Sequence, residues 1–465
     1  MTEFDMIRTT KKRAYVETYG CQMNISDGEL MEGLLEDGGY EIVSSPEQAD
    51  VVLVNTCAIR EHAEKRVLGR VGQLNGLKKD RPDLILGVTG CMAQRMGESL
   101  LEQAPYIDLV MGPDGYRSLP ERLKDIEEGR RARPSRSGKK RGPQLAVLDL
   151  SLGENYEGLV QRRASRVSAW VPIQRGCDHR CTYCIVPYVR GGEKNRRPVE
   201  VMREIDDIVA SGVTEVMLLG QTVNSYEADG WSFPELLRTV ARVEGIERVR
   251  FMSPHPKDVT PALVDVMAEE SAVCEHLHLP LQAGSDRTLK RMLRRYSVDG
   301  FLEKVALVRD AIPDIALSTD VIVAFPGETE EEFEETLELL RTVRFDEAYM
   351  YKFSPREGTP ATRLPTTDFV SDDEAQGRLE RLIDMQRAIQ SEINRGEVGR
   401  IEEVLVEKEA RGPNQILGRT RRNKLVAFVG SPDLIGGYHT VRLTDTTGAT
   451  FMGELLEARI PAVSP

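Results

Sequence analysis

The sequence predicts an α/β protein of three modules: an open parallel-sheet domain, a partial (β/α)6 barrel and a small antiparallel β-barrel. Strand and helix patterns alternate along the first 128 residues. Six strand-then-helix units follow. Near the C-terminus, short β-rich runs are separated by Gly, Pro and Asn turns. Together these three observations indicate the fold class.

Composition fits a folded protein, because 40% of the 465 residues are hydrophobic and 29% are charged. The length is typical of about three domains. No run approaches the ~18 apolar residues of a membrane span, and the N-terminus has no apolar signal segment, so we expect a cytoplasmic protein. The net charge of −13 argues against a basic protein that coats nucleic acid, whereas a local basic face is compatible with this charge.

The first module is expected over residues 11–128, with alternating strands and helices. Its strands are predicted at 13–18, 51–55 and 84–88. Ser26-Asp27-Gly28-Glu29 fits a capping box and predicts a helix that ends at Gly38-Gly39. A charged helix is expected over 60–79. Alternation of this kind favours a mostly parallel sheet.

A cysteine follows each of these three strands: Cys21, Cys57 and Cys91. Because ligands of open α/β sheets collect beyond the carboxyl ends of the strands, we expect the three thiols to converge. The alternative is three unrelated buried cysteines, since free cysteine often packs in cores. Cys274 stands alone and is expected to be such a core residue.

The linker, residues 129–164, contains a run rich in Lys and Arg and free of acids at 130–141. It is interpreted as a solvated linker, with a basic arm that contacts a polyanion as the alternative.

The second module is expected over 165–392. Its strands are predicted near 169–174, 214–219, 247–252, 276–281, 315–323 and 347–353, and its helices include 198–211 and 328–342. In barrels of parallel βα units, chemistry gathers at the C-terminal ends of the strands.

The third module, 396–463, has strands predicted at 403–406, 425–429 and 438–443. Between them lies the basic run 419–424, Arg-Thr-Arg-Arg-Asn-Lys. A small β-barrel with a basic loop is a plausible RNA-binding unit. The alternative is an exposed turn rich in arginine.

Three cysteines within eight residues form the sharpest motif: Cys177, Cys181 and Cys184, spaced CxxxCxxC. Three thiolates bind a 4Fe–4S cluster and leave one iron without a protein ligand. Structural zinc is the alternative, with His179 as fourth ligand. The motif follows the first barrel strand, so it lies at the catalytic end.

This motif resembles the signature of the radical S-adenosylmethionine (SAM) enzymes. The resemblance implies that the open iron chelates SAM and that one electron cleaves SAM to a 5′-deoxyadenosyl radical, with Cys177, Cys181 and Cys184 as the catalytic cluster ligands. It also implies that Tyr183 lies beside the SAM adenine. Gly220 and Gln221 fall where the superfamily contacts the methionine moiety.

Along almost its whole length the chain resembles the methylthiotransferase family of radical SAM enzymes. The matching segments include Tyr19-Gly20-Cys21-Gln22-Met23-Asn24, Asn55-Thr56-Cys57-Ala58-Ile59-Arg60-Glu61, Gly90-Cys91-Met92-Ala93-Gln94-Arg95, Cys181-Thr182-Tyr183-Cys184-Ile185-Val186-Pro187, His278-Leu279-Pro280-Leu281-Gln282 and Phe325-Pro326-Gly327-Glu328-Thr329. The third module then resembles the RNA-binding TRAM domain, and within the family the chain looks most like the bacterial branch that acts on tRNA.

The resemblance implies two 4Fe–4S clusters, the auxiliary one held by Cys21, Cys57 and Cys91, and two molecules of SAM. It implies that a methylthio group is added to carbon 2 of N6-isopentenyladenosine 37 in the tRNA anticodon loop. An aromatic C–H has no acidic proton, so a radical suits this reaction better than acid–base catalysis. A flavodoxin or ferredoxin as electron donor and a monomeric state are expected.

Two other hypotheses stay open. In the first hypothesis, the chain performs the same chemistry on threonylcarbamoyladenosine in tRNA or on an aspartate of a ribosomal protein. A protein of another class, a non-catalytic iron–sulfur protein that binds RNA or transfers electrons, is also compatible with the motifs.

Overall fold

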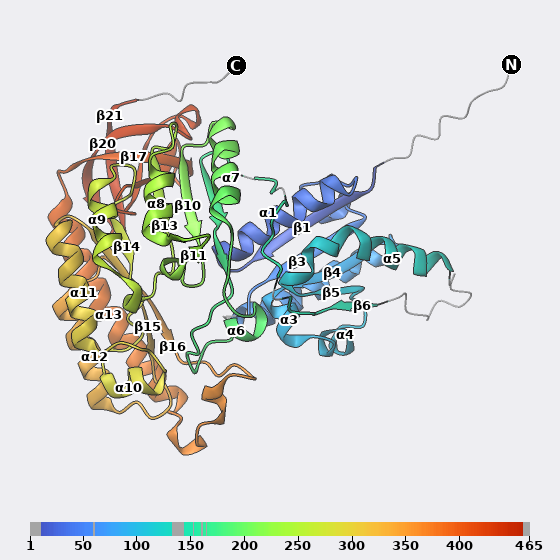
Figure 1. Cartoon of the computed structure of the whole chain (residues 1–465), viewed down its shortest axis with the longest axis horizontal. Helices are drawn as coiled ribbons and strands as arrows, with labels where there is room; N and C mark the ends of the chain where they lie inside the picture. The colour runs from blue at the N-terminus through green and yellow to red at the C-terminus, as the bar shows by residue number, and fades with distance from the viewer. Residues whose placement is uncertain are drawn as a thin grey trace. The chain divides into compact units, whose positions relative to one another are not determined.

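The computed structural model describes residues 11–58, 61–132, 144–151, 153–159, 161–163 and 165–458. The chain divides into two compact units (Figure 1). The first comprises Met1–Ala164, Gly176–Asp178 and Ile185–Lys194, and the second comprises Ser165–Arg175, His179–Cys184 and Asn195–Pro465.

A six-stranded, fully parallel sheet forms the centre of the first unit, in the order β2-β1-β3-β4-β5-β6. The strands are β1 (Arg13–Tyr19), β2 (Glu41–Ile42), β3 (Val51–Thr56), β4 (Ile85–Gly90), β5 (Leu109–Met111) and β6 (Leu145–Val147). Every residue of β3 and β4 is buried, which explains the apolar runs 51–54 and 85–88 with which they begin. The predicted open parallel sheet is confirmed.

The helices of this unit are α1 (Gln22–Asp37), α2 (Glu61–Leu74), α3 (Cys91–Met96), α4 (Ser99–Gln103) and α5 (Leu119–Ala132). The capping box predicted at Ser26 is wrong, because α1 begins at Gln22, with Cys21 at its N-cap position. Gly20, with φ +148°, turns the chain directly from β1 into the helix. Ser26 and Asp27 are consequently buried inside α1. The helix ends at Gly38, as predicted.

Six parallel strands form the predicted partial barrel in the second unit. They are β7 (Ser168–Pro172), β10 (Glu215–Leu219), β13 (Arg248–Phe251), β14 (His276–His278), β15 (Ala316–Val323) and β16 (Glu347–Lys352). Two three-stranded sheets, β13-β10-β7 and β14-β15-β16, are joined by a parallel bridge between Val249 and Val273. The strands therefore follow one another in chain order, and the partial (β/α)6 barrel is confirmed.

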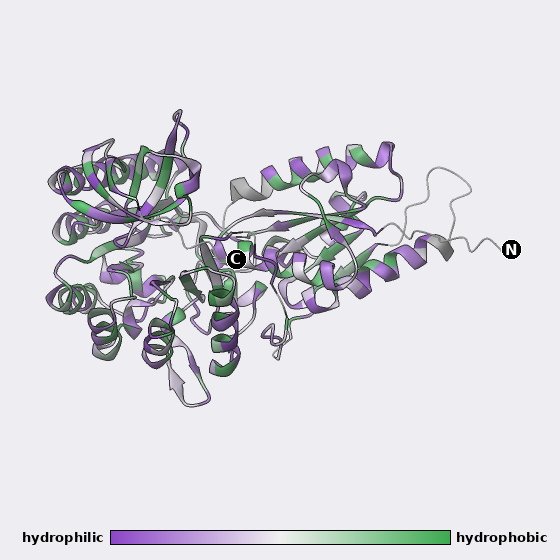
Figure 2. Ribbon diagram, turned by 90° about the horizontal axis from the view of Figure 1, so that it is seen from above, coloured by the Kyte–Doolittle hydropathy of each residue, from purple (hydrophilic) through white to green (hydrophobic). Residues whose placement is uncertain are grey.

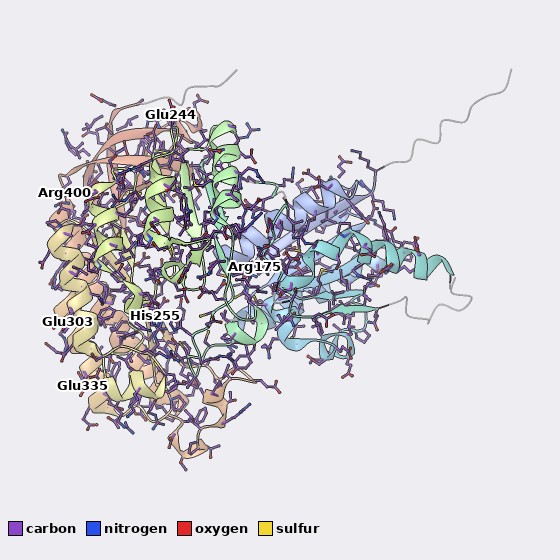
Figure 3. The ribbon with its side chains drawn as sticks, viewed as in Figure 1. Arg175, Glu244, His255, Glu303, Glu335 and Arg400 are labelled. Atoms are coloured by element: carbon purple, nitrogen blue, oxygen red, sulfur yellow. The ribbon has the colours of Figure 1, made fainter. Side chains whose placement is uncertain are left out.

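Helices cover the outside of this partial barrel (Figure 1). They are α7 (Pro198–Ala210), α8 (Phe233–Ala241), α9 (Pro261–Glu269), α10 (Asp286–Arg291), α11 (Val298–Ala311), α12 (Glu330–Val343) and α13 (Asp372–Glu397). Hydrophobic residues lie along the strands and inner helix faces, and hydrophilic residues lie outside (Figure 2). In Figure 3 Glu303 and Glu335 lie exposed on the outer helices, whereas the polar Arg175 and His255 are buried exceptions to this division.

The C-terminal part of the second unit is a closed five-stranded barrel in the order β17-β18-β19-β21-β20. Its strands are β17 (Ile401–Glu409), β18 (Gln415–Thr420), β19 (Leu425–Val429), β20 (Tyr438–Thr446) and β21 (Thr450–Glu457). All pairs are antiparallel except β19 with β21, which is parallel. The predicted small barrel is confirmed, with this one pairing as a difference.

Within the described ranges, no helix is long and apolar enough to span a bilayer. The module limits 11–128, 129–164, 165–392 and 396–463 stay predictions. Most of the basic run 130–141 lies outside the described residues.

Candidate active site

Three cysteines follow three adjacent strand ends of the first unit. Tyr19 pairs in register with Thr56, and Thr56 with Gly90, so β1, β3 and β4 end at the same level. Cys57 and Cys91 come directly after two of these ends, and Cys21 follows the third after Gly20. The strand order reverses between β1 and β3, and ligands of open α/β sheets bind at such a switch point.

Backbone proximity and two asparagines hold these strand ends together. A Cβ atom on Gly20 would lie 2.7 Å from the Cβ of Cys57, so the loops after β1 and β3 touch. Asn24 Nδ2 donates to the carbonyl of Thr56 at 3.3 Å, and Asn55 Nδ2 donates to the carbonyl of Asn24 at 2.7 Å. The α1 N-terminus is therefore tied to the end of β3.

The three thiols share one electrostatic environment. A hydrogen bond with Cys57, together with the nearby cation of Arg190, lowers the pKa of Cys21 to about 6 against the opposing effect of burial. Burial raises the pKa of Cys91, although Arg190 opposes the rise. Thiolates are the form that binds iron, so the low pKa of Cys21 prepares the site for metal.

Arg190 is a site residue that the sequence reasoning missed. Its Nε donates to the Cys91 sulfur at 3.2 Å, and its Nη2 donates to Asp27 at 2.6 Å. Arg190 and Asp27 are each only 2% exposed. Ala58, Ile185 and Val189 form an apolar cluster with Cys91. Arg190 lies in the segment that follows the CxxxCxxC motif, which was the only signal for it in the sequence. Its partner Asp27 was interpreted as part of a helix cap, so a buried position in α1 was not expected for it.

This donor set fits an iron–sulfur cluster. Three buried or half-buried cysteines, none of them in a disulfide, meet at one edge of a sheet beside a buried guanidinium. Three thiolates are the ligands that a 4Fe–4S cluster takes when one iron is left for another ligand.

The CxxxCxxC motif lies where β7 ends. The Cys177 amide donates to the Gly191 carbonyl at 3.2 Å within the first unit. Cys181 and Cys184 belong to the second unit, where the Cys184 amide donates to the Cys181 carbonyl at 3.0 Å. Both Cys177 and Cys181 are buried, and Cys184 is half-buried. The chemistry of this donor set again fits iron–sulfur ligation.

Tyr183 and Arg294 lie beside the second half of this motif. Arg294 Nη1 is 3.5 Å from the Cys181 sulfur, and its Nε donates to the Tyr296 hydroxyl at 3.1 Å. Burial raises the pKa of Tyr183, and the nearby Arg294 counteracts this rise. The neutral, half-buried ring of Tyr183 thus lies next to the cysteines, where a stacked adenine is expected.

Gly220 and Gln221 follow β10 at the same end of the barrel. A Cβ atom on Gly220 would lie 2.9 Å from Val223 Cα and 3.0 Å from Gln174 Oε1, which leaves no room for a side chain. Gln174 Oε1 accepts from the Thr222 amide at 3.0 Å and fixes this turn. In the described structure Gln221 Oε1 is buried without a hydrogen-bond partner, as expected of an acceptor that awaits a ligand.

His179, the fourth ligand of the zinc alternative, lies with His255 and Asp258. The two rings stack with centroids 4.1 Å apart, and His179 Nε2 is 3.7 Å from Asp258 Oδ2. Burial, followed by the charge of Arg294, lowers the pKa of His255 to about 2. One ligand atom from each of the three residues lies within 4.8 Å of the others, so they could hold a metal ion. Cys274 is buried, as predicted.

The alternative of an exposed turn at 419–424 is wrong, because none of these residues is exposed; RNA binding by this basic run stays a prediction. Arg421 pairs with Glu275 at 2.8 Å, Arg422 with Glu397 at 2.8 Å, and Lys424 with Asp346 at 2.5 Å. Arg422 and Lys424 are buried. Acids of the partial barrel and of α13 thus form ion pairs with these three cations of the run 419–424.

Partners of this turn lie at the N-terminal ends of the barrel strands. Arg248 and Arg250 of β13 donate to the carbonyls of Arg419, Thr420 and Arg421 at 2.8–2.9 Å. Asp346 and Glu275 directly precede β16 and β14. The turn therefore attaches the closed barrel to the face opposite the cysteine motif. Sequence alone did not reveal the acids that surround it.

Family models match three parts of the chain. Residues 13–112 match the uncharacterized protein family UPF0004, residues 171–340 match the radical SAM superfamily, and residues 395–456 match the TRAM domain.

Two relatives match nearly the full length. A tRNA-2-methylthio-N(6)-dimethylallyladenosine synthase from Thermoanaerobacter sp. (strain X514) is 46% identical over 95% of this chain and 92% of its own. The enzyme of that name from Moorella thermoacetica is 44% identical over 96% of this chain and 99% of its own.

Solved structures share the fold at low identity. The radical S-adenosylmethionine methyltransferase TsrM from Kitasatospora setae superposes with a TM-score of 0.55 at 17% identity, covering 76% of this chain and 77% of its own. The cobalamin-dependent radical enzyme OxsB superposes with a TM-score of 0.52 at 14% identity, covering 80% of this chain and 56% of its own.

Proposed function

The chain belongs to the family of tRNA-2-methylthio-N(6)-dimethylallyladenosine synthases, and from this premise we propose that it adds a methylthio group to carbon 2 of N6-isopentenyladenosine 37 in tRNA. It is a radical SAM enzyme of the methylthiotransferase type with a C-terminal TRAM domain. The observation that carries the proposal is the convergence of Cys21, Cys57 and Cys91 in a chain that also has the CxxxCxxC motif.

We propose two 4Fe–4S clusters, one on Cys21, Cys57 and Cys91 and one on Cys177, Cys181 and Cys184. The two sites supply different chemistry when loaded: reductive cleavage of SAM to a 5′-deoxyadenosyl radical at the second, and a held sulfur for methylation and transfer at the first. The support is the donor set, because each site offers three thiols that form no disulfide.

The protein's own residues orient the SAM that the second site binds. Tyr183 offers its ring to the adenine from a position beside Cys181 and Cys184. Gln221 offers its unpartnered Oε1 to the ammonium group of the methionine moiety, and Gly220 lets the backbone approach closely. Arg294 keeps a positive charge near the thiolates, which stabilises them.

At the first site the residues have a different task. The Arg190–Asp27 pair places a buried cation against the Cys91 sulfur. Ala58, Ile185 and Val189 pack with Cys91 and limit the access of water. The cation of Arg190 favours an anionic sulfur at this site, and the apolar side chains shield that sulfur from water.

Substrate entry requires an accessible adenine. The nucleoside next to the anticodon lies in a single-stranded loop, so it can be unstacked into a pocket at modest cost. We propose a one-electron donor of the flavodoxin or ferredoxin class. We also propose a monomer.

The test is nucleoside mass spectrometry of tRNA from a host that lacks its own enzyme of this family. Expression of the chain should convert N6-isopentenyladenosine to its 2-methylthio derivative. Conversion of threonylcarbamoyladenosine instead, or methylthiolation of a ribosomal protein aspartate, would assign the same chemistry to another substrate. Absence of all three products from a chain with full iron content would favour the non-catalytic hypothesis.

A further inference from the structure

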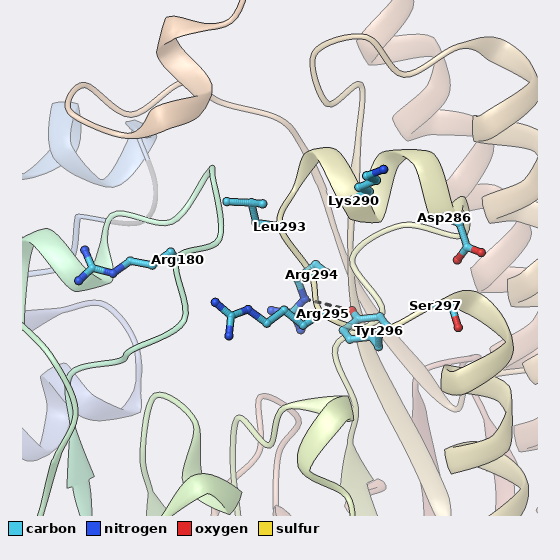
Figure 4. A pocket seen from close by; sticks show the side chains of 8 residues that line it. All are labelled: Arg180, Asp286, Lys290, Leu293, Arg294, Arg295, Tyr296 and Ser297. Atoms are coloured by element: carbon cyan, nitrogen blue, oxygen red, sulfur yellow. Dashed lines mark hydrogen bonds between the residues drawn. The ribbon is translucent and has the colours of Figure 1, made fainter.

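A cavity of about 420 Å³ opens in the second unit beside the cysteine motif (Figure 4). Its lining carries four cations and one carboxylate: Arg180, Lys290, Arg294, Arg295 and Asp286. We propose that this cavity binds the sugar–phosphate backbone of the RNA substrate close to the target base. This inference rests on the proposed function, because it names where that substrate is held.

The cavity is fastened to the cysteine motif by hydrogen bonds. The Thr182 amide donates to the Met292 carbonyl at 3.1 Å, and the Thr182 hydroxyl donates to the Arg291 carbonyl at 2.9 Å. Arg180 directly precedes Cys181. A ligand in the cavity therefore lies at the C-terminal end of the barrel strands, where the chemistry takes place.

Three of the cations are available to a ligand. Arg180, Lys290 and Arg295 are exposed, and within the part of the chain that the structure describes their side chains have no hydrogen-bond or ion-pair partner. Asp286 forms no ion pair with these cations in the described residues, and its carboxylate accepts from the Val298 amide at 2.7 Å, near the start of α11. This contrasts with the turn 419–424, whose cations are paired. Lysine and arginine of this kind bind the phosphates of nucleic acids.

An exposed leucine lies in the same lining. Leu293 is 53% exposed and has φ +55°, a left-handed conformation that usually calls for glycine. The hydrogen bonds from the amides of Leu293 and Arg294 to the carbonyls of Lys290 and Leu289 fix it at the end of α10. Leu293 and Arg295 project to the same side, while Arg294 turns to Tyr296 (Figure 4). Strained residues cluster at functional sites, and an apolar side chain among cations suits a base or sugar.

The shape of the site favours RNA over an acidic protein such as the electron donor. A protein partner requires a broad contact of about 800 Å² on each side. Here the free cations surround a cavity with room for a nucleotide-sized group, and the chain as a whole is acidic. The phosphates of a single RNA strand that reaches into the cavity can pair with these cations.

The experiment compares a Lys290→Gln/Arg295→Gln double variant with a control, Arg387→Gln, at an exposed position of α13. Affinity for tRNA that carries N6-isopentenyladenosine is measured at a series of salt concentrations, at equal iron content. Each single-strand phosphate contact contributes about 0.7 to the slope of log Kd against log salt, so the double variant should lose about 1.4. Arg387→Gln should lose nothing, and Lys290→Arg/Arg295→Lys should keep the slope.

An unchanged slope in the double variant would overturn the proposal. If the double variant binds tRNA normally but a flavodoxin reduces the protein more slowly, the proposal is also overturned. The cavity would then be the binding site of the acidic electron donor. A wild-type chain that binds tRNA with the expected slope but yields no methylthiolated nucleoside would refute the proposed function and leave the cavity proposal supported.

Discussion

Replacement of Arg422 by methionine tests whether the basic turn of the C-terminal barrel is structural. Arg422 donates to both carboxylate oxygens of Glu397, at 2.8 and 3.0 Å, and to Glu402 at 2.8 Å. The side chains of Arg422 and Glu397 are only 10% and 9% exposed. Methionine keeps most of the volume, but it leaves the Glu397 carboxylate buried without this cation.

Loss of one partner from a buried ion pair costs about 3–5 kcal/mol. Since 1.36 kcal/mol corresponds to a factor of ten, local opening of the barrel should become roughly 150- to 5,000-fold more frequent. A second change, Glu397→Gln, removes the stranded charge and should recover most of this loss. The pair Arg442–Glu454 of the same barrel is 46% and 59% exposed, so Arg442→Met should cost about 1 kcal/mol or less.

Hydrogen exchange of the amides in β17–β21, followed by mass spectrometry, measures this opening directly. We expect much faster exchange in Arg422→Met and near-native exchange in Arg442→Met. Native protection in Arg422→Met would refute the structural role. If Arg422→Met keeps native protection but its binding of tRNA depends less on salt, the turn contacts RNA.

The remaining predictions concern the two cysteine sites. Cys57→Ala should keep about half of the iron and still release 5′-deoxyadenosine, but make no methylthiolated nucleoside; product formation would contradict its role. Cys181→Ala should release no 5′-deoxyadenosine in the presence of SAM and a strong reductant, and normal release would refute its assignment. In metal-free protein, alkylation of Cys21 should rise as pH increases through about 6, because its thiolate forms there, while Cys91 reacts only at higher pH; peptide mass spectrometry showing equal rates at pH 7 would refute this order. Arg190→Gln should make the potential of the N-terminal site more negative, because a cationic donor to sulfur is lost, and an unchanged midpoint in an EPR-monitored titration would refute this.

The positions of the cysteines could be predicted because strands and their ends are encoded locally. Apolar runs such as 51–54 specify buried parallel strands, and the residue after each strand lies at one edge of the sheet. The register of β1, β3 and β4 then brings Cys21, Cys57 and Cys91 to the same level. Their assignment as cluster ligands depends on the family resemblance as well as on this geometry.

The features that sequence missed depend on partners distant along the chain. Ser26 and Asp27 match a capping box, but Gly20 and Asn24 tie the helix start to β3, and tertiary contacts override the local signal. Arg421 and Arg422 look like an RNA-binding run until Glu275 and Glu397 are placed against them. In physical terms, a cation that is paired with an acid is less available for RNA than an unpaired one, and the sequence does not say which acids are near.

The most direct measurement uses tRNA with deuterium at carbon 2 of adenine 37. The reconstituted enzyme, supplied with SAM and reductant, should transfer one deuterium to 5′-deoxyadenosine for each 2-methylthio-N6-isopentenyladenosine formed, because the radical removes the hydrogen that sulfur replaces. Product formed together with unlabelled 5′-deoxyadenosine would contradict radical activation at carbon 2.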